Sequence, residues 1–295
     1  MTSFYDKNDP DCKEFCLVLE EFVQEEFSGF DQKDHPMTLE DVGPYLDDLA
    51  ALHASCWDTP IEDKPGLRDY AAHWGSLDAQ FPQMWGIMEA EYEATFGHTL
   101  WAEVTEEEGA AVKELSGLLA GEHGPKINAA LLARFRSRPR SITHGDARGQ
   151  NVFREKAGER KFALIDWQMW VAGPVAYEFN QVWMNSFDPG SGVTERFEEL
   201  MAQYHATLVR LEPRAAEYTL ETLLADVKLQ LWCDFVTFPI NFVTFPITFP
   251  IILSLFPHHF LFAARSGCSM WGSLAGCWPA TKIRRMPAGR LTGTC

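Results

Sequence analysis

Three side chains with oxygen donors stand at a spacing that suits phosphoryl transfer. Asp146 is followed five residues later by Asn151, and Asp166 closes an apolar run twenty residues after the first. Transfer from ATP needs a carboxylate that orients the attacking hydroxyl and accepts its proton. It also needs oxygen ligands for the Mg²⁺ that neutralises the triphosphate. The pattern therefore predicts Asp146 as the base and Asn151 and Asp166 as the metal ligands.

The segment between these residues offers a way to bring them together. Residues 152–165 (VFREKAGERKFALI) have the pattern of two strands joined by a turn that contains glycine. Closing such a hairpin places Asp166 beside Asn151. The triplet His144-Gly145-Asp146 alone would be a weak signal, but an Asn and a strand-ending Asp at these offsets make it specific.

The catalytic string resembles a known group of phosphotransferases. HGDARGQN at 144–151 and ALIDWQ at 163–168 are similar to motifs of the aminoglycoside phosphotransferase and ecdysteroid-kinase-like families, relatives of choline kinase with the protein-kinase-like fold. Protein kinases place their base and metal-binding Asn at the same spacing. The resemblance covers roughly residues 4–234 and implies an ATP- and Mg²⁺-dependent transfer to a hydroxyl of a small molecule. Protein kinase activity is disfavoured, because HGD replaces HRD, IDW replaces DFG and no APE segment follows.

The resemblance also implies roles for residues outside the three oxygen donors. EFCLVLEEF at 14–22 is similar to the last small-lobe strand and the hinge, where backbone groups of Glu20 and Phe22 would bind adenine. LAALHASCW at 49–57 is similar to the helix that follows. Arg148 would meet the transferred phosphate, with a surface salt bridge as the equal alternative.

Two further residues are expected to support the catalytic loop. We interpret His144 as structural, because such a histidine holds the Asp in place. Glu178 ends the segment GPVAYE, where the related families normally have Asp, and that carboxylate ties down the loop backbone. The other histidines, His53 among them, show no metal-ligand spacing, and we interpret them as ordinary.

The expected fold class is α+β with the protein-kinase-like fold, consisting mostly of the helical large lobe and the catalytic-loop hairpin. About a dozen residues precede the strand at 14–19, too few for a Gly-rich strand pair and the Lys–Glu pair of a kinase. We therefore expect the small lobe to be largely missing and ATP to bind poorly. The predicted parts are a small-lobe and hinge remnant at 1–22, the large lobe at 23–234, and a separate segment at 235–295.

The last segment is unusual. FVTFPI occurs at 235–240 and again at 242–247, and residues 235–256 carry no charge. That length could span a bilayer, but three internal prolines would each cost about 3 kcal/mol in an ordinary helix. We favour a degenerate repeat that does not belong to the domain, and keep a membrane-associated protein through residues 235–262 as an alternative.

Composition limits the partners. The net charge is −17, from 42 acidic and 25 basic residues, which disfavours nucleic acid as a ligand. Seven cysteines include no CxxC pair, and the acidic N-terminus is unlike a signal peptide, so we expect a cytoplasmic monomer. The sequence does not identify the substrate. A catalytically inactive kinase-like binding module is the remaining alternative.

Overall fold

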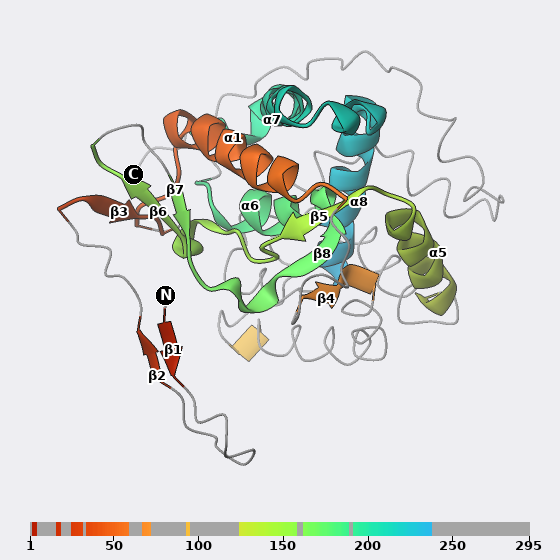
Figure 1. The fold of residues 1–295 in the computed structure, drawn as a ribbon, viewed down its shortest axis with the longest axis horizontal. Helices are drawn as coiled ribbons and strands as arrows, with labels where there is room; N and C mark the ends of the chain where they lie inside the picture. The colour runs from red at the N-terminus through yellow and green to blue at the C-terminus, as the bar shows by residue number, and fades with distance from the viewer. Residues whose placement is uncertain are drawn as a thin grey trace. The chain divides into compact units, whose positions relative to one another are not determined.

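The computed structural model describes residues 2–4, 16–18, 25–31, 34–58, 67–71, 93–94, 124–157, 162–188 and 191–237 (Figure 1). Contacts between residues divide the chain into Met1–Phe256 and Pro257–Cys295, and all of the described residues belong to the first of these units. Glu20 and Phe22, the expected adenine-binding residues, lie outside the described part. The expected loss of the small lobe and the three predicted parts of the chain therefore stay predictions.

Helices and short strands alternate in the described residues, which confirms mixed helix and strand content with small sheets. The helices are α1 (Leu39–Ser55), α5 (Gly124–Arg136), α6 (Phe179–Asn185), α7 (Phe197–Leu211) and α8 (Leu220–Thr237). α1 begins after Thr38, whose backbone N–H donates to the Asp41 carboxylate at 3.0 Å. A carboxylate in the first turn satisfies a free N–H and compensates the helix dipole.

Residues 144–151, the expected catalytic loop, connect two three-stranded sheets. In the first, β6 (Val152–Glu155) pairs antiparallel with both β3 (Phe27–Gly29) and β7 (Phe162–Leu164). In the second, β8 (Val171–Pro174) pairs antiparallel with β5 (Arg140–Thr143) and parallel with β4 (Arg68–Asp69). A separate antiparallel pair joins β1 (Thr2–Phe4) and β2 (Cys16–Val18). The predicted hairpin over residues 152–165 is thus confirmed as β6 and β7.

The helical core forms where α1 lies against α7 (Figure 1). Leu46 and Leu49 of α1 and Tyr204 and Leu208 of α7 are all at most 1 % exposed. Their spacing of three and four residues puts them on one face of each helix. This packed pair is the rigid base from which α1 and α7 reach the catalytic loop.

A buried carboxylate joins α5 to α8. Asp226 of α8 is completely buried, and it accepts hydrogen bonds from Arg134 Nε at 2.7 Å and from Arg138 Nε at 2.6 Å. The Tyr218 hydroxyl donates to the same carboxylate at 2.9 Å. A buried charge is tolerated when it is paired and hydrogen-bonded in this way.

No helix among the described residues is long and apolar enough to cross a membrane. α8 ends at Thr237. Most of the segment 235–262, which the membrane alternative depends on, lies beyond the described part of the chain.

Candidate active site

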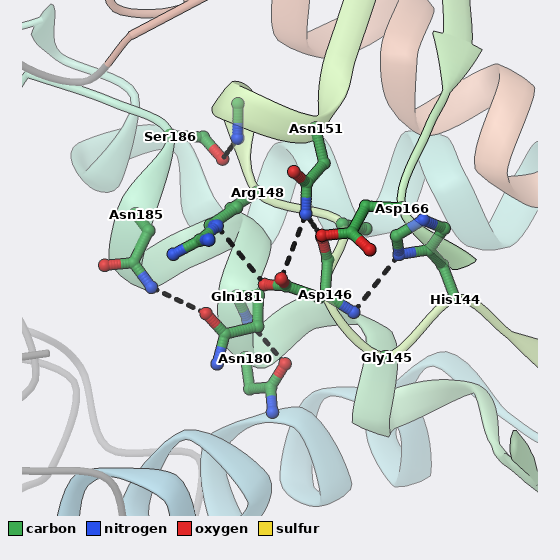
Figure 2. Close-up of polar contacts among 12 residues, drawn as sticks. His144, Gly145, Asp146, Arg148, Asn151, Asp166, Asn180, Gln181, Asn185 and Ser186 are labelled. Carbon is green, nitrogen blue, oxygen red and sulfur yellow. Dashed lines mark hydrogen bonds and ion pairs between the residues drawn. The ribbon is translucent and has the colours of Figure 1, made fainter. Parts of the chain in front are cut away.

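The catalytic loop runs from His144 at the end of β5 to a short 3-10 helix at Gly149–Asn151 that leads into β6. Within it, Asn151 holds Asp146 through its side-chain amide. Nδ2 of Asn151 donates to the main-chain oxygen of Asp146 at 2.8 Å and to its carboxylate Oδ2 at 3.0 Å (Figure 2). Asn151 is 6 % exposed, so the amide is a fixed clamp on the Asp146 side chain.

The hairpin brings Asp166 to the same place. Val152 pairs with Leu164, and the backbone N–H of Ile165 donates to the carbonyl of Asn151 at 3.0 Å, so the next residue is Asp166. Its backbone is left-handed, with φ 63° and ψ 55°, a conformation that Asp adopts more readily than most residues. The exposed Asp166 carboxylate lies with Asp146 and Asn151 on one side of the loop (Figure 2).

His144 spans the gap between the catalytic loop and the hairpin. Its Nδ1 accepts a hydrogen bond from the backbone N–H of Asp146 at 3.2 Å, and its Nε2 lies 2.7 Å from the carbonyl oxygen of Ile165. Because a backbone N–H can only donate, Nδ1 must be unprotonated, and Nε2 must carry the hydrogen that reaches Ile165. His144 is completely buried, and Trp167 packs edge-on against it at 4.6 Å between ring centroids. The imidazole thus links the loop backbone at Asp146 to the end of the hairpin at Ile165.

The Glu178 carboxylate accepts hydrogen bonds from the backbone of the loop. Its Oε2 accepts from the N–H of His144 at 2.6 Å, and its Oε1 accepts from the N–H of Gly145 at 3.1 Å. Burial by itself raises the pKa of this fully buried carboxyl. Hydrogen bonds from His53 and from the His144 backbone lower the pKa by more than burial raises it, so the net pKa lies below the ordinary value. Glu178 therefore carries its charge in the folded protein and holds the loop by charge-assisted hydrogen bonds.

His53, which the sequence led us to interpret as ordinary, belongs to this support. Its Nε2 lies 3.3 Å from Glu178 Oε2, and its Nδ1 lies 2.7 Å from the Tyr204 hydroxyl. Burial and the charge of Glu178 raise the pKa of Tyr204, so the hydroxyl keeps its proton and can donate to Nδ1. Nε2 then donates to Glu178. The one signal available in the sequence was a histidine on the apolar face of its helix, where a buried polar group needs a partner.

Two more supports of the loop could not be found from the sequence. The buried Tyr45 hydroxyl donates to the main-chain oxygen of Ala147 at 2.9 Å. The backbone N–H of Gly149 donates to Ser186 Oγ, also at 2.9 Å, and Ser186 is completely buried. Helix α1 and the residue after α6 therefore fix the loop on both sides of Arg148.

Gly145 is required by the geometry of the loop. Its φ is +80°, and a Cβ atom there would lie 2.5 Å from the main-chain oxygen of Met169. Real Cβ atoms do not approach a carbonyl oxygen so closely. The middle residue of the HGD triplet therefore has to be glycine in this fold.

The environment of Asp146 favours its protonated form more than water would. Burial raises its pKa, and the nearby charge of Asp166 raises it as well. The Arg148 guanidinium, with Nε 3.4 Å from Asp146 Oδ1, and the hydrogen bond from Asn151 oppose this shift, but the net pKa is above the ordinary value. A carboxylate with a raised pKa is a stronger proton acceptor than an ordinary Asp.

The oxygen donors of the site match a hard divalent cation. Asn151 uses Nδ2 for both bonds to Asp146, which leaves Oδ1 as its oxygen donor, and Asp166 adds an exposed carboxylate. The described residues contain no cluster of three or more His, Cys, Asp or Glu side chains that could enclose a metal by themselves. Mg²⁺ is commonly held by one or two carboxylates with substrate phosphates and water completing its shell, so this donor set fits.

Comparison with known protein families identifies the class. Residues 36–218 match the APH phosphotransferase enzyme family, and the chain belongs to that family. The resemblance that the catalytic string suggested is therefore confirmed.

Among solved structures, an ethanolamine kinase from Plasmodium vivax is similar at 10 % sequence identity with a TM-score of 0.38. The similarity covers 83 % of this chain and 64 % of the kinase, so the chain spans less than two thirds of that protein. No curated protein matches the chain.

Proposed function

We propose that the protein transfers the γ-phosphoryl group of ATP, with Mg²⁺, to a hydroxyl group of a small molecule. The observation that carries this proposal is the fixed arrangement of Asp146, Asn151 and Asp166 on one side of the catalytic loop (Figure 2). Membership of a phosphotransferase family supports it. Phosphoryl transfer depends on positioning and electrostatics more than on covalent chemistry by the protein, so a rigid constellation of this kind is what the reaction needs.

Asp146 orients the acceptor and takes its proton. Asn151 occupies Oδ2 of the carboxylate, and Oδ1 lies on the side of Arg148. The acceptor hydroxyl donates to Asp146, its O–H bond breaks as its oxygen bonds to the γ-phosphorus, and the bond between that phosphorus and the β–γ bridging oxygen breaks to release ADP. The raised pKa of Asp146 favours acceptance of this proton.

Oδ1 of Asn151 and the carboxylate of Asp166 would hold Mg²⁺, which when bound neutralises the phosphate charges. The Arg148 side chain is 39 % exposed and projects beside Asp146. Its guanidinium there compensates the negative charge of the phosphoryl group that is being transferred. Its ion pair with Asp146 holds it there until the nucleotide binds. Glu178 and His144 take no part in proton transfer and keep the loop in place.

Radiolabel transfer from [γ-³²P]ATP tests the proposal. The purified protein is incubated with millimolar Mg·ATP and a panel of hydroxyl compounds, and products are separated by thin-layer chromatography. We expect a labelled product, and we expect Asp146→Asn to lower kcat by at least about 10²-fold, the usual size of a general-base contribution. Equal activity in Asp146→Asn, or no transfer to any compound, would overturn the proposal.

A further inference from the structure

Two amide side chains of α6 lie one helical turn apart beside the catalytic loop. Nδ2 of Asn185 donates to Oε1 of Gln181 at 2.7 Å. Figure 2 shows both side chains on the side of the loop where Arg148 projects, next to Asp146. Ser186, which follows Asn185, bonds the backbone of Gly149, so this end of α6 is fixed against the loop. None of the roles assigned above uses Gln181 or Asn185.

This place also holds polar atoms without partners. Asn185 is 1 % exposed, and its Oδ1 is buried and accepts no hydrogen bond. Nε of Arg148 is likewise buried without a hydrogen bond, with only the longer ion pair to Asp146 at 3.4 Å. Buried polar groups in folded proteins are nearly always satisfied. A buried amide oxygen without a donor, near a guanidinium nitrogen that has an ion pair but no hydrogen bond, indicates that a polar ligand completes these contacts.

The charges around this place select the kind of ligand. The cation here is Arg148, and the polar side chains that α6 and its end contribute are neutral amides and a hydroxyl. Glu178, the carboxylate before α6, is completely buried and bonded to His144 and Gly145 behind the loop. Asp146 and Asp166 are engaged as base and metal ligand in the proposed function. A cationic head group would therefore meet the positive charge of Arg148.

We propose that Gln181 and Asn185 form the acceptor-binding subsite and select a neutral polyhydroxyl compound over a cationic amino alcohol. The inference rests on the proposed function. Oε1 of Gln181 is held by Asn185, so the Nε2 hydrogens of Gln181 donate to one acceptor oxygen while Oδ1 of Asn185 accepts from a neighbouring hydroxyl. A compound with several hydroxyl groups can supply both contacts and the hydroxyl whose proton Asp146 takes.

The test compares two substrate panels with native and variant protein. Glycerol, myo-inositol and methyl α-D-glucopyranoside form the neutral panel, and ethanolamine and choline form the cationic panel. We expect kcat/KM for the best neutral acceptor to exceed that for either amine by at least tenfold. Gln181→Glu keeps the size of the side chain and its bond from Asn185, but it loses the donors and adds a negative charge.

We expect Gln181→Glu to raise KM for the neutral acceptor at least tenfold while KM for ATP stays unchanged. The ratio of kcat/KM for the neutral acceptor to kcat/KM for the amines should fall or reverse. Ala216→Glu is the control for an added negative charge, because Ala216 is exposed in the 3-10 helix Pro213–Glu217, and its kinetics should equal the native ones. Gln181→Met, which keeps the size of the half-buried side chain without its donors or an added charge, serves as a second variant should Gln181→Glu not fold, and it should also raise KM for the neutral acceptor.

A native preference for the amines, or an unchanged acceptor KM in the folded variant, would overturn this inference while leaving the phosphotransferase proposal intact. Failure of the native protein to phosphorylate either panel would overturn the subsite. Failure with every hydroxyl compound would overturn both proposals.

Discussion

Glu178→Gln is the substitution for which the structure gives the most detailed expectation. The carboxylate has three partners: the backbone N–H groups of His144 and Gly145, and Nε2 of His53. An amide of the same size has one oxygen instead of two, so at least one buried N–H must face an NH₂ group. The variant loses charge-assisted bonds worth about 1.5–3 kcal/mol and leaves an unsatisfied buried donor that costs about 1–3 kcal/mol. We expect a loss of about 3–5 kcal/mol in the free energy of unfolding, the usual cost of removing one partner of a buried charged pair.

That loss should appear in thermal and urea unfolding and in catalysis. About 2–4 °C of Tm per kcal/mol is typical of a domain of this size, so Tm should fall by roughly 6–20 °C. In the variant that remains folded, kcat should fall while KM for ATP changes little, because the loop that carries Asp146 shifts. Glu199→Gln is the control, since Glu199 is an exposed partner of Arg196 and should leave both readouts near native. A Glu178→Gln protein as stable as the native one would refute the reasoning.

The same residue gives a pH dependence of stability. The pKa of Glu178 is lower in the folded protein than its ordinary value, so the unfolded chain binds the proton more tightly. The stabilisation is fully present above the unfolded pKa of about 4.3 and is lost as pH falls through the folded pKa. Urea unfolding at a series of pH values should show a steeper acid loss in the native protein than in Glu178→Gln. Parallel curves would contradict this account.

Three further predictions follow from the loop and its supports. Gly145→Ala should lower the free energy of unfolding, measured in urea, by at least about 1–2 kcal/mol because of the left-handed backbone alone. The clash of the added Cβ with the main-chain oxygen of Met169 should increase this loss. A variant as stable as the native protein would contradict the loop geometry. The acid limb of the kcat/KM–pH profile, which reports the free enzyme, should lie above the ordinary Asp value of about 3.9, because the Asp146 carboxylate must be ionised and its pKa is raised. Arg148→Gln should move that limb further up, since the guanidinium lowers this pKa, and a limb that stays in place would count against the ion pair. His53→Phe should cost about 2–4 kcal/mol in urea unfolding, because Tyr204 and Glu178 each lose a buried partner. His205→Phe is the comparison, because the His205 ring bonds the backbone carbonyl of Tyr218. Equal costs in the two variants would show that the His53 network adds no stability.

The sequence predicted the parts of the site whose geometry is local. Asp146 and Asn151 share one loop, and the hairpin that brings Asp166 to them has its own turn and alternating strands, so spacing alone placed all three. Residues 194–233 have the pattern of amphipathic helix, and the structure divides them into α7 and α8, separated by a 3-10 helix beginning at Pro213. Proline at the start of the new turn ends the preceding helix.

The missed residues act across long separations in the chain. His53 meets Glu178 and Tyr204 because α1 packs on α7, and neither contact has a local pattern in the sequence. A histidine at such a position could equally have been exposed or bonded to its own helix. The roles that we propose for Gln181 and Asn185 lacked a signal for the same reason, because they depend on the approach of α6 to the loop at Gly149. Tertiary packing, which the sequence does not state directly, decides these roles.

The central claim is that Oδ1 of Asn151 and the carboxylate of Asp166 hold one nucleotide-bound divalent cation beside the base Asp146. Mn²⁺·ATP, added at millimolar concentration to ¹⁵N-labelled protein, tests it directly, since Mn²⁺ broadens NMR signals of nuclei close to it. We expect the Asn151 side-chain amide and the backbone amides of Asp166 and Trp167 to broaden first, and Asp166→Asn to abolish the effect at the same concentration. Broadening centred elsewhere in the chain, or unchanged in Asp166→Asn, would contradict the account.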